Sequence, residues 1–113
     1  MLWDYFKHLK TQAPIYNNIM DEDENSIPQH YVVLEEGVYD ESLASGDGLS
    51  LVRKSSFNIR IHSRTFTKAI SLTTSYRAVL LQRGMAFQQY GPTYDPNSKY
   101  YSVLITGTQA YGT

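Results

Sequence analysis

The sequence contains 113 residues, of which 42% are hydrophobic and 19% are charged, so it has the composition of one ordinary globular domain. Ten lysines and arginines stand against eleven aspartates and glutamates, and this balance lacks the basic excess with which proteins bind nucleic-acid phosphates. Cysteine is absent, which excludes a disulfide framework and a thiolate zinc site. No stretch approaches eighteen apolar residues and no export signal is evident, so we expect no membrane span.

The first third of the chain predicts a helix, a loop and a strand. Apolar side chains recur at helical spacing over residues 2–13, and the helix should end before Pro14, because the residue preceding a proline is disfavoured in the α conformation. The acidic run 21–24 is typical of a solvated loop. Adjacent β-prone residues in 29–36 then predict the first strand.

The middle of the chain predicts a long excursion, a second strand and a second helix. Residues 35–50 contain many acidic residues and glycines but few apolar ones, which indicates a flexible segment. Apolar and polar side chains alternate over 57–62, as in a strand with one buried face. Helical spacing returns over 65–83, and Gly84 is a suitable C-cap residue.

Two further β-prone runs, 85–90 and 100–106, are separated by the turn-forming segment 91–99, and this predicts an antiparallel hairpin. Residues 107–113 should be frayed. The order α-β-β-α-β-β predicts one α+β domain over residues 1–113, with a single antiparallel or mixed sheet of about four strands and two helices packed on it. The apolar positions that share one face of each element predict the core: Leu2, Phe6, Leu9, Val33, Phe57, Ile59, Ile61, Ile70, Val79, Leu80, Val103 and Ile105.

The residues that usually perform catalysis or bind metals are not spaced for either task. The histidines, His8, His30 and His62, lie on different predicted elements without the i, i+4 spacing that joins two imidazoles on one metal. The segment after Asp21 matches only the start of a calcium loop, because Val32 stands where a bidentate glutamate is needed. No serine lies in a Gly-x-Ser-x-Gly elbow. We therefore expect no enzyme activity, no metal and no cofactor.

Tyrosines and charged side chains are the candidates for contacts with other proteins. Tyrosine occurs ten times, and it is enriched both at interfaces and in half-buried strands. The basic-enriched stretch 53–77 is typical of the polar side of a strand and helix, and the alternative is a surface for an acidic partner. The candidate subunit-interface residues are Tyr90, Tyr94, Tyr100, Tyr101, Asp47, Arg53, Arg60 and Arg64.

The order of elements, together with four short segments, resembles a known family. The segments are 28–34, 56–62, and the turn 91–95 ahead of the strand 99–105. They resemble the small tail-terminator proteins of long-tailed bacteriophages, also called tail-completion or head-to-tail joining proteins. The resemblance extends over about residues 2–106 and lies in element order and turn placement.

The resemblance implies a virion structural protein. Subunits of this family form a hexameric ring that caps the finished tail tube, ends its growth and joins the tail to the head connector, and no cofactor belongs to that role. It implies a homo-oligomer at the head-proximal end of the tail, assembled in the host cytoplasm, with the tail tube protein and the head connector as partners. The alternatives are another phage connector or minor tail component, and a small ferredoxin-like ligand-binding or regulatory domain.

Overall fold

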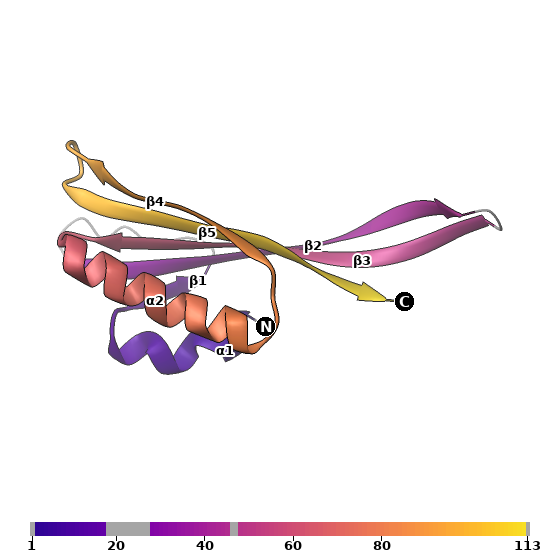
Figure 1. Cartoon of the computed structure of the whole chain (residues 1–113), viewed down its shortest axis with the longest axis horizontal. Helices are drawn as coiled ribbons and strands as arrows, with labels where there is room; N and C mark the ends of the chain where they lie inside the picture. Colours follow the sequence, from indigo (N-terminus) through magenta and orange to yellow (C-terminus); the bar gives the residue numbers. More distant parts are fainter. Residues whose placement is uncertain (1, 18–27, 46–47, 113) are drawn as a thin grey trace.

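The computed structural model describes residues 2–17, 28–45 and 48–112, and at residues 2, 17, 38–45, 48–55 and 109–112 it describes the backbone alone (Figure 1). The chain has an α+β fold, in which five strands of the described part form one mixed sheet and both helices, with a short 3₁₀ helix, cover one face of it. The elements in chain order are α1 (Leu2–Phe6), η1 (Lys7–Thr11), β1 (Ile15–Asn17), β2 (His30–Ser45), β3 (Gly48–Ser63), α2 (Phe66–Gln82), β4 (Phe87–Asp95) and β5 (Tyr100–Gly112). The predicted class is confirmed.

The sheet has the strand order β1-β2-β3-β5-β4. β1 pairs with β2 in parallel, from Ile15↔Val32 to Asn17↔Leu34, and the other neighbouring strands are antiparallel. The sequence did not predict β1, because a strand of three residues is too short to display an alternating pattern. The sheet therefore has one strand more than the four expected, and the first helix is shorter than predicted, since it continues beyond Phe6 as the 3₁₀ helix η1.

The predicted excursion 35–50 is mostly regular strand. β2 and β3 form one hairpin of two 16-residue strands, paired without interruption from His30↔Ser63 to Ser45↔Gly48. Residues 46 and 47 lie outside the described part. Backbone hydrogen bonds to a partner strand do not require apolar side chains, so a polar, glycine-containing segment can still be a strand. The half of this hairpin nearest its turn, residues 38–45 and 48–55, is called the arm below. It extends beyond the helix-covered body, and the molecule measures 56 × 28 × 26 Å (Figure 1).

The last strand, β5, extends further toward the C-terminus than expected. β5 continues through Gly112 and pairs with β3 as far as Val52↔Gly112, whereas the sequence predicted fraying from residue 107. The reason is the length of β3, which offers a ladder of backbone groups that the local sequence of residues 107–112 does not reveal. The first part of the arm therefore has three strands, and among the described residues only β2 and β3 continue from Val52 toward the turn of the hairpin.

The core lies between the helices and the sheet face that they cover, called the inner face below. From the strands it receives alternate residues such as Phe57, Ile59 and Ile61, which are almost completely buried. The prediction is confirmed at nine positions that are buried or packed against this core: Phe6, Leu9, Phe57, Ile59, Ile61, Val79, Leu80, Val103 and Ile105. The side chain of Leu2 lies outside the described part.

One predicted core position, Ile70, is wrong, and another, Val33, is buried as predicted but on the other face of the sheet. Ile70 is 38% exposed, because α2 turns a different stripe of side chains inward. That stripe consists of Ala69, Leu72, Thr73, Tyr76 and Leu80. Val33 is buried on the sheet face opposite the helices, called the outer face below, while its neighbours Val32 and Leu34 enter the core. Successive strand residues point to opposite faces, so a run of three apolar residues leaves the inward pair undetermined in the sequence.

The ends of α2 follow local chemistry. Thr65 is the N-cap residue, and its side chain accepts a hydrogen bond from the backbone N–H of Lys68. At the other end Gly84 has a φ of 66°, a left-handed conformation that glycine adopts without strain, and the N–H of Met85 donates to Leu80 O at 3.0 Å. The predicted helix and its C-cap are confirmed. No helix in the described part of the chain is both long and apolar enough to cross a membrane.

Candidate subunit interface

Three aromatic side chains form an exposed cluster at the end of the sheet that is remote from the arm. Tyr94 of β4 and Tyr101 of β5 are directly paired, with ring centroids 4.9 Å apart, and Phe66 at the start of α2 meets Tyr101 edge-on at 5.6 Å. Tyr94 is 48% and Phe66 is 52% exposed, and Ile70 lies one helical turn after Phe66. Large aromatic side chains that keep half of their surface in water are typical anchors of protein interfaces. Phe66, Tyr94 and Tyr101 are called the aromatic cluster below.

Tyr100 is not available for contacts, although it was a candidate. Its side chain is 6% exposed, its hydroxyl donates a hydrogen bond to Pro28 O at 2.6 Å, and its ring meets Tyr31 edge-on at 5.6 Å. The guanidinium of Arg64, another candidate, lies 4.5 Å from the centre of the same ring. These contacts connect the start of β5 to the start of β2, so Tyr100 and Arg64 stabilise the fold at this end of the sheet.

The sheet positions two histidines of the described part on opposite faces, His62 on the outer face and His30 on the inner face, where it pairs with Ser63. His62 lies between Tyr31, whose ring stacks on it at 4.7 Å, and Ser102, with which its Nδ1 shares a hydrogen bond of 3.0 Å. Burial, and secondarily the positive charge of Arg60, lower the pKa of His62. His30 Nδ1 lies 2.7 Å from Ser63 Oγ. Burial and then Lys68 lower the pKa of His30, so both rings are neutral structural side chains near neutral pH.

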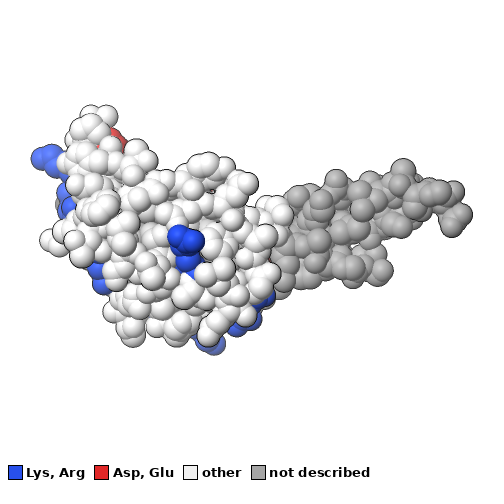
Figure 2. All heavy atoms as spheres, viewed as in Figure 1, with Lys and Arg blue, Asp and Glu red and all other residues white. Residues whose placement is uncertain are grey.

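The remaining candidates are dispersed. Arg60 is exposed on the outer face and pairs with Glu35 of the neighbouring strand. Tyr90 is 56% exposed on β4, and its hydroxyl donates to Gln88 Oε1 at 2.8 Å. Arg53 stands opposite Asp40 and Tyr111 in the arm, where only the backbone is described, and Asp47 lies outside the described part. The Lys and Arg side chains visible in Figure 2 are scattered over the described surface and do not form a patch.

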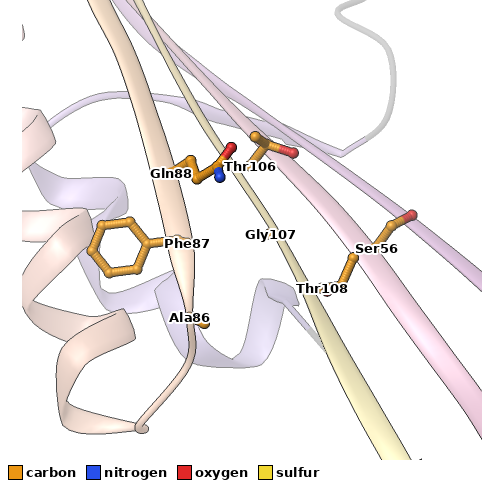
Figure 3. A pocket seen from close by; sticks show the side chains of 7 residues that line it. All are labelled: Ser56, Ala86, Phe87, Gln88, Thr106, Gly107 and Thr108. Atoms are coloured by element: carbon orange, nitrogen blue, oxygen red, sulfur yellow. The ribbon is translucent and has the colours of Figure 1, made fainter.

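A hollow of about 440 Å³ lies where β4 meets β5 at the base of the arm (Figure 3). Its lining consists of Ser56, Ala86, Phe87, Gln88, Thr106, Gly107 and Thr108. Figure 3 shows the ring of Phe87 directed toward α2, on the other side of β4 from the Gln88 and Thr106 side chains.

Gly107 is required by the packing beside this hollow. A Cβ atom at Gly107 would lie 2.5 Å from Ala86 O and 2.6 Å from Phe57 Cζ, so only glycine allows β4 and the Phe57 ring to approach. Sequence reasoning missed the hollow, because it depends on where β4 begins relative to β5 and no local pattern encodes that register.

The described residues contain no group of three or more His, Cys, Asp or Glu side chains that could hold a metal ion. Their most distinctive surfaces are the aromatic cluster at one end of β3 and the arm at the other. Among the candidate residues whose side chains are described, Tyr94 and Tyr101 meet in an exposed contact, and Arg64 lies against the buried Tyr100. Comparison with protein-family models and with curated proteins found no match to this chain.

Proposed function

We propose that this chain is a virion structural protein of a long-tailed bacteriophage, which forms a hexameric ring on the end of the tail tube, ends tail growth and joins the tail to the head connector. The observation that carries the proposal is the arm. From Val52 toward the turn of the hairpin, the described part of the arm has two strands, and an isolated two-stranded hairpin is marginally stable in water. Contacts with a neighbouring subunit are the natural source of additional stability for such an element.

The position of the aromatic cluster supports a head-to-tail contact between copies. Ser63 pairs with Tyr101 at one end of β3, and Gly48 pairs with Ser45 at the other, so the aromatic cluster and the arm lie at opposite ends of the same strand. A subunit that presents two different surfaces can contact the next copy heterologously, and heterologous contacts close into a ring when the rotation per subunit divides the circle.

The α+β architecture and the sequence resemblance supply the rest of the proposal. The number six, the tail tube protein and the head connector all come from the resemblance to tail-terminator proteins. The arm and the aromatic cluster by themselves favour a subunit of a protein assembly over a ligand-binding domain of the ferredoxin-like type.

The test is an electron cryo-microscopy map of the particles that contain the chain. We expect a six-fold ring of this subunit between the tail tube and the head connector. Particles produced from a genome in which its reading frame is stopped early are the control, and they should contain overgrown tails that are not joined to heads. Single copies of the chain, or a ring at another position in the particle, would contradict the proposal.

A further inference from the structure

One edge of β5 has no partner strand within the described residues. The last pair between β4 and β5 is Phe87↔Gly107, but β5 continues from Thr108 to Gly112 with β3 on its other side. In a β-strand the backbone N–H and C=O groups point alternately to the two sides. Residues 108–112 therefore present unpaired groups to which another strand can add.

The hollow lies directly beside this open edge. Thr108 is the first residue beyond the pairing with β4, and it lines the hollow together with Ser56 and Thr106. A strand added to residues 108–112 would run along the side of the hollow, which has room for one of its side chains (Figure 3). The unpaired backbone and the hollow thus form one continuous surface.

A second open edge lies on β2. β1 covers only Val32 to Leu34 of this strand, and from residue 35 to residue 45 the described part provides a partner, β3, on one side only. Because β2 and β5 flank β3, the two open edges lie on opposite sides of the same sheet. One copy can therefore add its β2 edge to the β5 edge of the next, and the sheet then continues from copy to copy.

We infer that residues 35–45 of a second copy add as a strand to residues 108–112 and place one side chain in the hollow. The inference rests on the head-to-tail assembly proposed above. The charges of the two segments indicate that the β2 edge is the strand that adds. The segment 35–45 contains four acidic residues and no lysine or arginine, and the segment 108–112 has no charged residue.

The same charges disfavour the symmetric alternative. Two β2 edges placed together would bring acidic side chains of both copies onto neighbouring strands, and like charges on paired strands are destabilising. Against β5 the acidic strand instead lies one strand away from β3, which contains Arg53 and Lys54 opposite Tyr111 and Ala110. The head-to-tail pairing is therefore favoured over pairing of identical β2 edges.

Cysteine cross-linking tests the pairing directly, since the natural chain has no cysteine. A variant with Ala110→Cys is mixed, under mild oxidation and at high protein concentration, with variants that each carry one cysteine at a position from 35 to 45. We expect a mixed disulfide at the position of β2 that lies opposite residue 110, weaker ones two residues to either side of it and none at the positions between, because only side chains on the same face and close to opposite each other can bridge. Ser71→Cys, on the exposed side of α2, is the matched control and should give none. Disulfides only between two Ala110→Cys copies, or none at all, would overturn the inference.

A second pair of variants tests the open edge of β5 at a position that carries no cysteine. Thr108→Glu, added to the cross-linking pair, should reduce the mixed disulfide at least tenfold, because a charged side chain at an open edge opposes strand addition and a carboxylate there repels the acidic strand. Thr74→Glu, at an exposed position of α2, should leave it unchanged, and both variants should melt like the parent. An unchanged yield with Thr108→Glu would contradict the inference.

The outcomes separate this inference from the proposed function. A six-fold ring at the tail end without the period-two cross-links would refute the strand addition and leave the tail-terminator proposal intact. Period-two cross-links in a chain that the map locates elsewhere would refute the proposed function and leave the strand addition intact.

Discussion

Tyr76 lies at the centre of the core with no exposed surface, and its ring stacks on Phe6 at a centroid distance of 4.8 Å. Its hydroxyl is buried and has no hydrogen-bond partner among the described residues, and burial raises the pKa of the phenol. The ring is thus well packed, but the oxygen loses its contact with water without compensation. A buried polar group in this situation costs about 1–3 kcal/mol.

Removal of that hydroxyl should stabilise the protein. We expect Tyr76→Phe to raise the free energy of unfolding by about 1 kcal/mol, as measured by urea denaturation. Tyr76→Leu, which also removes the stack on Phe6, is the control and should lower it. A Tyr76→Phe variant less stable than the parent would show that the hydroxyl is hydrogen-bonded in the folded protein.

His62 should make stability depend on pH. Its pKa is below 6.5 in the folded chain, so on acidification the unfolded chain binds a proton first and is stabilised. The free energy of unfolding should therefore fall as the pH falls from about 7.5 to 5.5, above the range in which Asp and Glu titrate. The pKa of His30 is also lowered, so this residue too makes the free energy of unfolding fall as the pH falls.

The histidine contribution can be isolated by substitution. His62→Gln should weaken the pH dependence, and the double variant with His30→Gln should be nearly flat over this range, as measured by thermal melting at each pH. A parent protein equally stable at pH 7.5 and 5.5 would contradict the proposed cause.

Gly107 and Gly37 provide a matched pair of strand glycines. A Cβ at Gly107 would contact Ala86 O and Phe57 Cζ at 2.5 and 2.6 Å, whereas at Gly37 the nearest atom is Ser56 Oγ at 3.4 Å, an ordinary contact. Gly107→Ala should therefore destabilise the fold by about 1–3 kcal/mol, the usual cost of overpacking, and Gly37→Ala should have little effect or stabilise slightly. Equal melting temperatures for the two variants would show that β4 shifts freely away from β5.

At the scale of the elements, Ile59 and Ile70 compare the same residue type in two environments. Ile59 is completely buried in β3, whereas Ile70 is 38% exposed on α2. Ile59→Ala should cost about 2–5 kcal/mol, since it removes buried methyl groups and leaves a cavity. Ile70→Ala should cost much less, and chemical denaturation of the two variants in parallel checks the difference. A larger loss at Ile70 would mean that α2 packs with its other side against the sheet.

At the scale of the whole molecule, the aromatic cluster should contribute to assembly more than to folding. Tyr94→Ala leaves the core untouched, because Tyr94 contacts Tyr101 at the surface and is 48% exposed. If the aromatic cluster is an interface anchor, the substitution should weaken subunit association by about 2 kcal/mol or more. Sedimentation of the assembled particles measures this, with the melting temperature of the isolated chain as the check on folding.

The control for this experiment is an equally apolar surface residue elsewhere. Leu81 is 65% exposed near the C-terminal end of α2, whereas Phe66 of the aromatic cluster is the first residue of that helix. Leu81→Ala should leave association unchanged. If the two variants assemble alike, the aromatic cluster is not a subunit contact.

The sequence by itself determined the features that depend on neighbouring residues in the chain. The alternation over 57–62 correctly oriented Phe57, Ile59 and Ile61, because the strand period of two applies to every residue in turn. The helix over 65–83 and its glycine C-cap were also predictable, since capping is a local interaction. Together with the turn-rich segment before β5, these patterns were sufficient for the α+β class.

Only the tertiary structure decided what depends on partners far away in the chain. Residues 35–45 and 107–112 are strand because β3 is long enough to pair with both, and Tyr100 is buried because Pro28 and Tyr31 cover it. The open edges of β2 and β5, and the hollow beside one of them, follow from the register between strands. Backbone hydrogen bonds between strands are the same for almost any side chain, so the local sequence carries little information about which edges remain free.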